Sequence, residues 1–308
     1  MATTMAAVTT LGVLAIPVLY AAQGQLPDLR SQNVAVIAVS PDGRIVATGE
    51  RAATVKLWNP GTGALDRTLQ AHSAPVSALA FSPDGSVLAT GSFDHWIRLW
   101  NATSGRMTLE LGGHPGHVKS LAFTQDGDLL ASAGADGVRL WDVGAGSLRT
   151  ELPSPRGVVA AVFAANGMMV ASAGGDGVKL WNVATGRLVR AIDSGGELVL
   201  ALAISPDGRQ LAGGGTGRTA RVWDIQTGKL TRTSARGDDF VRSVAFSPDG
   251  STVLVADRTA TRMWNLGTGV MRSIVADTSF AVVALSAQGR VLGAAARDDA
   301  IRAIPLLE

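Results

Sequence analysis

The sequence contains no cysteine and little charge, and each shortage excludes a class of protein. Without cysteine, disulfide scaffolds, cysteine-ligated zinc and thiol nucleophiles are excluded. Charged residues make up 17% of the 308 residues, and 27 Lys and Arg against 25 Asp and Glu leave a net charge of +2. Disordered chains are poor in apolar residues, whereas 46% of this chain is hydrophobic. The chain is therefore expected to fold, and no basic excess indicates nucleic acid as a partner.

Tryptophan reveals an internal repeat. Six of the seven Trp residues follow one another at spacings of 42, 41, 40, 42 and 41, namely Trp58, Trp100, Trp141, Trp181, Trp223 and Trp264. A turn of the Ser-Pro-Asp-Gly type precedes each of them, as at residues 40–43, and a degenerate copy recurs at residues 286–289. The sequence therefore contains seven similar units.

Each unit carries the signals of short β-strands. In the second unit, residues 76–81 alternate small or polar side chains with apolar ones, and the turn at 82–85 has Pro at its second position. Further short apolar runs follow at residues 87–90, 97–100 and 108–111. Beyond residue 24, no stretch sustains a helical period. We expect four strands in each unit.

The second unit also carries the residues of a known motif. They are His72, the run from Phe81 through Ser82-Pro83-Asp84 to Gly85, Leu88-Ala89-Thr90-Gly91-Ser92, Asp94, and Ile97-Arg98-Leu99-Trp100-Asn101. This pattern resembles a WD40 repeat, and the resemblance extends over residues 34–308. It implies an all-β fold, a seven-bladed β-propeller with four-stranded antiparallel blades, which we place at residues 25–308.

Closure of the ring is expected to need the N-terminus. The last unit supplies only three strands before the chain ends, so the missing outer strand is expected from residues 8–27. Residues 1–24 also hold an uncharged apolar run at 5–22, which is typical of a signal peptide or a single membrane anchor. Two hypotheses stay open: an exported or membrane-associated protein, or a cytoplasmic one in which this segment is the closing strand.

The WD40 resemblance implies hydrogen-bonded sets of His, Ser or Thr, Asp and Trp within the units. Two units carry all four residues: His72, Thr90, Asp94 and Trp100, then His114, Ser132, Asp136 and Trp141. Ala52, Gly217 and Thr259 replace the Asp in the first, fifth and sixth units. The same residue types occur in hydrolases, but no Gly-x-Ser-x-Gly elbow accompanies them. We interpret the sets as structural, with no catalytic residue.

Three further groups of residues are interpreted as structural. A basic residue stands two positions before the repeated Trp of each unit, or before the residue at its place in the last unit: Lys56, Arg98, Arg139, Lys179, Arg221, Arg262 and Arg302. The aliphatic part of each side chain is expected to pack between blades, with the charged group in solvent. Trp96 shares strand parity with Trp100, so packing between blades is expected. His95 and His117 can approach each other, but no acidic ligand accompanies them, and neither a metal nor a cofactor is predicted.

The sequence favours a non-enzymatic scaffold that docks a peptide or partner domain on a propeller face. Alternatives are a binding or sensor subunit of a larger enzyme assembly, and a propeller enzyme. The position before the turn Asp varies between units, and four of its occupants form one expected arc, Arg51, Phe93, Arg258 and Arg297. Such an arc suits an acidic or phosphorylated peptide. Asp298 and Asp299 follow Arg297 in the chain and can neutralise part of the arc. The alternative interpretation is that these arginines are solvated and bind no partner.

Overall fold

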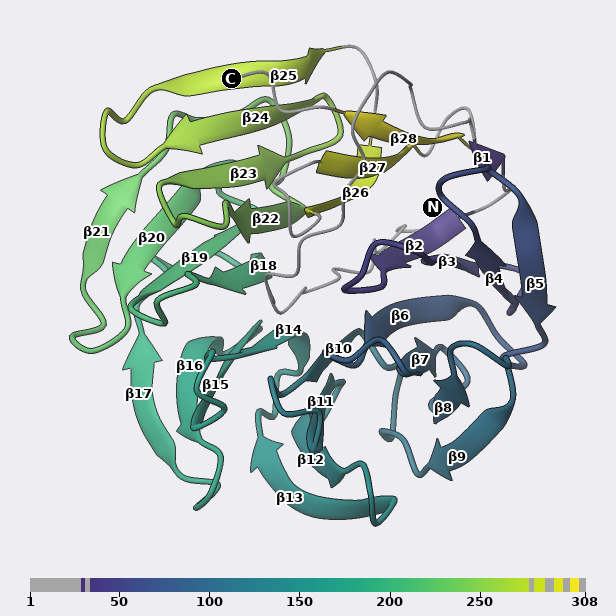
Figure 1. Cartoon of the computed structure of the whole chain (residues 1–308). Coiled ribbons are helices and arrows are strands. Elements are labelled where there is room, and N and C mark those ends of the chain that lie inside the picture. The colour runs from purple at the N-terminus through teal and green to yellow at the C-terminus, as the bar shows by residue number, and fades with distance from the viewer. Residues whose placement is uncertain (1–28, 31–33, 277–279, 286–290, 296–299, 305–308) are drawn as a thin grey trace, which may run out of the picture.

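The chain forms a β-propeller. The computed structural model describes the backbone of residues 29–30, 34–276, 280–285, 291–295 and 300–304, and the side chains of residues 34–273. Every described regular element is a β-strand, and the strands form four-stranded antiparallel sheets arranged around a common centre (Figure 1). The all-β architecture and the four-stranded antiparallel blades are therefore confirmed.

Six blades consist of four consecutive strands each, running from the centre outward. The innermost strands are β2 (Val34–Val39), β6 (Val76–Phe81), β10 (Ser120–Phe123), β14 (Val158–Phe163), β18 (Val199–Ile204) and β22 (Ser243–Phe246). The second strands are β3 (Val46–Glu50), β7 (Val87–Ser92), β11 (Leu129–Ala133), β15 (Met169–Gly174), β19 (Gln210–Gly215) and β23 (Thr252–Ala256). We number these blades one to six in chain order.

The remaining strands of these blades follow in the same order. The third strands are β4 (Val55–Trp58), β8 (Ile97–Asn101), β12 (Gly137–Asp142), β16 (Gly177–Asn182), β20 (Ala220–Asp224) and β24 (Ala260–Asn265). The outer strands are β5 (Leu65–Leu69), β9 (Met107–Leu111), β13 (Ser147–Pro153), β17 (Leu188–Ile192), β21 (Leu230–Thr233) and β25 (Met271–Ala276). The four strands expected in the second unit match β6 to β9 within two residues at each end.

A further sheet contains the last three strands of the chain and one from its start. It has the order β1 (Leu29–Arg30), β28 (Ala300–Ile304), β27 (Val291–Ala295) and β26 (Phe280–Leu285). Leu29 pairs with Ile301 in antiparallel register. The N-terminal strand seen here thus begins after the expected range 8–27, which lies outside the described residues.

The Ser-Pro-Asp-Gly turns fix the register between the first and second strands. In the second blade, Ser82 Oγ donates to Asp84 Oδ1 at 2.5 Å and accepts the backbone N–H of Val87 at 2.9 Å. Gly85 closes the turn with φ of 74°, a conformation that glycine adopts without strain. One short polar sequence therefore sets the pairing of β6 with β7.

Neighbouring blades pack closely through small residues on the second strands. A Cβ atom on Gly49 would lie 2.6 Å from Cγ1 of Val76 in the next blade, so only glycine fits at this contact. The six Trp residues of the third strands are at most 7% exposed. Burial of large aromatic side chains between sheets is the main source of stability in such a fold.

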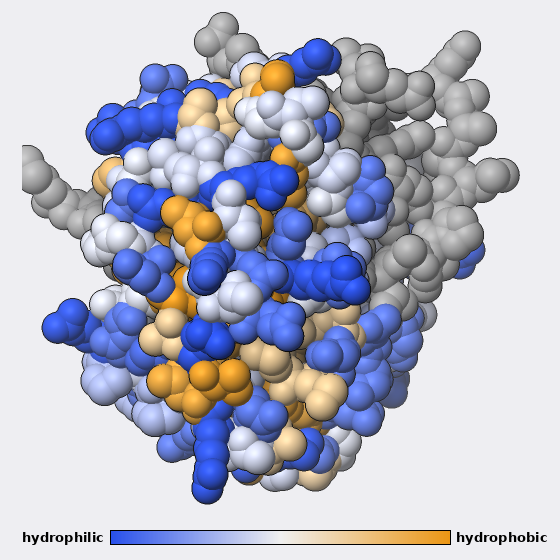
Figure 2. Space-filling view, turned by 90° about the vertical axis from the view of Figure 1, so that its left-hand side faces the viewer, coloured by the Kyte–Doolittle hydropathy of each residue, from blue (hydrophilic) through white to orange (hydrophobic). Residues whose placement is uncertain are grey.

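The two ends of the blades carry different loops. Because the strands are antiparallel, the loops between second and third strands lie at one end, which we call the upper face. The Ser-Pro-Asp-Gly turns lie at the opposite end, the lower face. Figure 2 shows the rim on the side of β17 and β21, where hydrophobic and hydrophilic residues are interspersed.

The apolar segment 5–22 lies outside the described residues. Within the described part of the chain, no helix is long and apolar enough to cross a membrane.

Candidate functional site

In the second blade, four side chains form a hydrogen-bonded series that ends at the upper face. Trp100 Nε1 donates to Thr90 Oγ1 at 3.0 Å, and Thr90 Oγ1 lies 2.8 Å from His72 Nε2. His72 Nδ1 lies 2.9 Å from Asp94 Oδ2. Because a carboxylate only accepts, Nδ1 carries the proton and Nε2 accepts from the Thr90 hydroxyl. The structure thus brings the first expected set together.

The third blade repeats this arrangement. Trp141 Nε1 donates to Ser132 Oγ at 2.8 Å, and Ser132 Oγ lies 2.8 Å from His114 Nε2. His114 Nδ1 lies 2.5 Å from Asp136 Oδ1. The second expected set is therefore also present.

The sets hold their histidines neutral and their aspartates ionised. Burial lowers the pKa of His72 and of His114 more than the neighbouring carboxylates raise it. Burial opposes ionisation of Asp94, but backbone N–H groups of Ser73 and Trp96 and the ring of His72 outweigh it and lower its pKa to about 2. A neutral imidazole between a hydroxyl and a carboxylate satisfies every member of the set.

The hydroxyls of these sets are enclosed. Thr90 and Ser132 are 0% exposed, and each accepts a tryptophan N–H. A nucleophile must reach its substrate, which a fully enclosed hydroxyl does not. The geometry supports the structural interpretation of both sets.

The sequence predicts that the charged ends of the third-strand basic residues lie in solvent. The structure shows them in ion pairs instead. Each of the six with a described side chain contacts a carboxylate of the upper face, at 2.5–3.2 Å: Lys56–Glu50, Arg98–Asp94, Arg139–Asp136, Lys179–Asp176, Arg221–Glu197 and Arg262–Asp257. Their side chains are only 16–25% exposed. Arg302 lies outside the described side chains.

Three of these carboxylates were not identified from the sequence as ion-pair partners. The first, fifth and sixth units lack Asp at the aligned turn position, and Glu50, Glu197 and Asp257 supply the charge from other positions. Glu50 ends β3, Glu197 lies in the loop before β18, and Asp257 follows β23. A search for any acid near the aligned position, rather than at it, would have found them.

The environment of Trp96 differs from its expected packing between blades. Its side chain is 42% exposed on the upper face. His95, which precedes it, has φ of 79°, so strand alternation does not extend from Trp100 back to Trp96. The expected inter-blade role of Trp96 is wrong.

Trp96 lies beside an aromatic cluster formed by loops of the second and third blades. The rings of Phe93 and His117 stack with centroids 4.2 Å apart and an interplanar angle of 20°. The ring of His95 lies 5.7 Å from that of His117. The approach of the two histidines is therefore confirmed, and no group of three metal-ligating side chains occurs among the described residues.

The expected partner arc is only partly described. Arg51 lies exposed in the loop between β3 and β4, and Phe93 is half-buried in the loop between β7 and β8. Arg258 is 67% exposed in the loop after β23, with Nε 3.9 Å from Asp239 Oδ2. Arg297 lies outside the described residues. Among the described members of the arc, Arg258 has Asp239 beside it, whereas Arg51 has no carboxylate at ion-pair distance.

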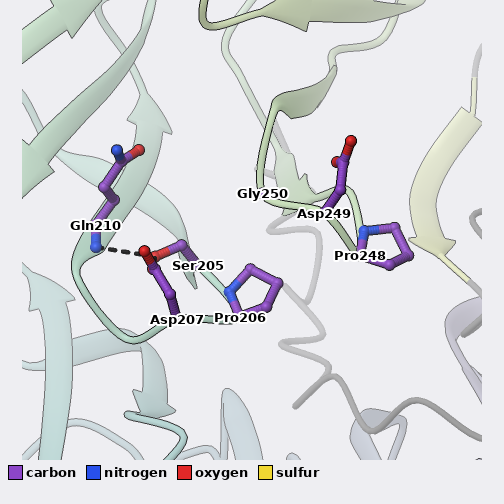
Figure 3. Close-up of a pocket in the computed structure, with 7 residues that line it drawn as sticks. All are labelled: Ser205, Pro206, Asp207, Gln210, Pro248, Asp249 and Gly250. Atoms are coloured by element: carbon purple, nitrogen blue, oxygen red, sulfur yellow. Dashed lines mark hydrogen bonds between the residues drawn. The ribbon is translucent and has the colours of Figure 1, made fainter.

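A pocket of about 280 Å³ opens on the lower face between two Ser-Pro-Asp-Gly turns (Figure 3). Its lining residues are Ser205, Pro206, Asp207, Gln210, Pro248, Asp249 and Gly250. The carboxylates of Asp207 and Asp249 accept hydrogen bonds from Ser205 and Ser247, which lower their pKa. These acids stabilise their own turns.

The repeating geometry agrees with a comparison against known families. The model of the WD40 family, described as "WD domain, G-beta repeat", matches residues 27–59, 63–101, 105–142, 186–224 and 228–265. These stretches cover more than half of the chain. The chain belongs to the WD40 family. WD40 repeat sequence is not matched at residues 143–185, yet β14 to β16 in that stretch form the same blade structure. No curated protein matches the chain.

Proposed function

We propose that this WD40 protein is a non-enzymatic interaction platform that docks an acidic or phosphorylated peptide on its upper face. WD40 propellers are commonly scaffolds for protein interaction. The observation that carries the proposal is an imbalance of available charge on the upper face. Over the first three blades, the described carboxylates at or near this face are all paired with a third-strand cation of their own blade: Glu50, Asp94, Glu110, Asp136 and Glu151.

Cations on the same part of the face are not neutralised in this way. Within the described residues, the cations Arg51 and Lys119 have no carboxylate at ion-pair distance, and neither do the imidazole rings of His95 and His117. The fifth and sixth blades differ, because Asp193 is exposed and the side chain of Asp238 is 82% exposed. A peptide with acidic side chains is therefore attracted to the first three blades.

The groups present also fit a peptide in their chemistry. A guanidinium such as that of Arg51 binds carboxylate or phosphate with two parallel hydrogen bonds. Phe93 and Trp96 offer apolar surface on the loop of the second blade, and aromatic side chains are frequent anchors at interfaces. Loops held by rigid strands keep these groups in place before the partner arrives.

Charge reversal tests this proposal. The probe is a short peptide of Glu, Gly and one phosphoserine with a pH-insensitive dye, and a peptide with Lys in place of the acidic residues is its control. We expect Arg51→Glu combined with Arg297→Glu to weaken acidic-peptide binding by about tenfold or more, with an unchanged melting temperature. Arg44→Glu is the matched variant, since Arg44 is an exposed arginine of the lower face.

Two outcomes would contradict the platform. Binding of the acidic peptide that survives the double variant would move the site away from this face. Equal binding of the acidic and the basic peptide would show that charge does not select the partner.

We also infer that the sheet of β26, β27, β28 and β1 is a seventh blade, and that β1 closes the ring. The pairing of β1 with β28 supports this, as does the position of β26, which contacts β22 of the sixth blade and β2 of the first. In this arrangement residues 25–308 form one propeller, which presents Arg51 and Arg258 two blades apart around the upper face.

A further inference from the structure

The stacked pair of Phe93 and His117 spans the boundary between two blades. Phe93 lies in the loop between β7 and β8, and His117 precedes β10. His95 stands beside both, with its ring centroid 5.7 Å from that of His117 at an interplanar angle of 43°. Two imidazoles therefore share one small patch of the upper face, and both side chains are exposed.

Backbone hydrogen bonds hold this patch in place. Phe93 N donates to Pro75 O at 3.0 Å, and His114 N donates to His95 O at 3.1 Å. Val118 N donates to Ser92 O at 3.1 Å, which ties the residue after His117 to the second blade. The buried sets at Asp94 and His114 anchor both loops from below. The two imidazoles are thus presented by a rigid support.

The patch disfavours charge on His117 while no partner is bound. Partial burial lowers the pKa of His117, and the positive charges of His95 and Lys119 lower it further. Lys119, two residues along the chain, and His95 on the facing loop are the charged or titratable groups that act on the His117 ring. No described carboxylate lies at ion-pair distance from the His117 ring, and Asp94, which precedes His95, is paired with His72 and Arg98. A carboxylate brought by a partner would reverse this balance and favour the protonated ring.

We propose that docking of an acidic segment on this patch is linked to protonation of His95 and His117, so that the partner binds more tightly as the solution becomes more acidic. The inference rests on the proposed function and adds a regulatory property to it. Phe93 and Trp96 supply the contact area at every pH, whereas the two imidazoles supply charge only when protonated. Histidine is the residue whose charge ordinarily changes between pH 5 and 8.

The direction follows from linkage. The bound state has the higher histidine pKa, so affinity rises as pH falls through that value and levels off below the pKa of the free state. A difference of one unit between the free-state and bound-state pKa of one imidazole corresponds to about a tenfold change in affinity. The partner's own carboxylates stay ionised above about pH 5, so the effect belongs to the protein in this window.

The experiment measures binding of a peptide of alternating Glu and Gly, without phosphate, to the full chain at about pH 7.5 and about pH 5.5. A peptide without phosphate is needed because a phosphate monoester itself titrates near pH 6. We expect affinity to rise by about tenfold or more on acidification. His95→Gln combined with His117→Gln should abolish most of this ratio. Arg51→Gln should weaken binding at both pH values and keep the ratio.

The outcomes separate this inference from the proposed function. Binding at both pH values with an unchanged affinity overturns proton linkage and leaves the platform intact. A pH ratio that persists in the double histidine variant assigns the linkage to other groups and also overturns the inference. Failure of this peptide to bind at either pH, while the phosphoserine peptide binds, overturns the linkage alone. Failure of both peptides overturns the platform, and the linkage with it. Circular dichroism at each pH establishes that every variant is folded.

Discussion

The carboxylate of Glu197 lies 2.9 Å from the guanidinium of Arg221, in the role that a turn aspartate has in the second, third and fourth blades. Gly217 occupies the position of that turn aspartate in the fifth blade, and a Cβ atom on it would collide with the Glu197 carboxylate. Glutamate from one loop and glycine in the other are therefore complementary. The ion pair is kept in the fifth blade although the aspartate is not.

This complementarity predicts a rescue. Glu197→Ala should destabilise the protein by about 1–2 kcal/mol, because Arg221 loses its charged acceptor. Gly217→Asp alone should also destabilise it, because the new side chain meets Glu197. Combined, the two changes should recover most of the loss, since the introduced aspartate would then serve Arg221. Urea denaturation of the three variants measures this, and additive losses would contradict it.

A second prediction concerns the indole N–H groups. Trp181 Nε1 donates to Ser172 Oγ at 2.9 Å, whereas the buried Trp223 Nε1 has no partner among the described residues, because Gly213 stands at the serine position. Trp181→Phe should therefore destabilise the protein by about 1 kcal/mol more than Trp223→Phe, since only the former breaks a hydrogen bond.

The control for this comparison removes the acceptor. In a Ser172→Ala background, Trp181→Phe should cost the same as Trp223→Phe. If Trp181→Phe and Trp223→Phe lower the denaturation midpoint equally when Ser172 is unaltered, the hydrogen bond adds nothing to stability.

Acidification should weaken the fold before it affects the aspartates. The lowered pKa of His72 and His114 means that the folded state binds fewer protons than the unfolded state, in which histidine titrates near 6.5. The free energy of unfolding should fall as pH drops below that value, by at most about 1.4 kcal/mol per pH unit for each histidine.

The contribution of ionised Asp94 should persist to lower pH. With a pKa of about 2 in the folded state, its stabilising effect is present above the unfolded value and is lost only as pH falls toward 2. Guanidinium denaturation across this range measures both effects. A His114→Gln variant should show a shallower slope between about pH 7 and 5, and stability that rises on acidification would contradict the assignment of neutral rings.

Ring closure gives the fourth prediction. Deletion of residues 1–33 removes β1 and leaves the edge of β28 unpaired, which should promote association of chains through that edge. Deletion of residues 1–24 keeps β1 and is the matched control. Light scattering and thermal denaturation should separate the two deletions. If the longer deletion stays monomeric with the melting temperature of the shorter one, β1 does not close the ring.

The repeat made most of the fold predictable. A single run such as residues 76–81 is a weak strand signal, but the same signal recurs near each Trp, and the repetition fixes its meaning. The sets at His72 and His114 were predictable because these units resemble WD40 repeats, and that resemblance implies the four members of each set. Strand β6 begins and ends at the expected residues.

The errors have two physical causes. An ion pair requires only that two groups meet in space, so Glu50 and Asp257 reach their partners from positions that no alignment of units selects. Alternation of side chains holds only within a strand, and the positive φ of His95 ends it just before Trp96. The stacking of Phe93 on His117 depends on two loops of different blades, which the sequence of one unit does not relate.

The exposure of Trp96 gives this chain an intrinsic optical reporter. The six other indoles are at most 7% exposed, whereas Trp96 is 42% exposed. Acrylamide should therefore quench the emission of Trp96 first, and the quenchable fraction of the fluorescence comes from the upper face beside His95. An unlabelled partner that covers this region would lower that fraction, while a partner bound to the lower face or the rim would leave it unchanged.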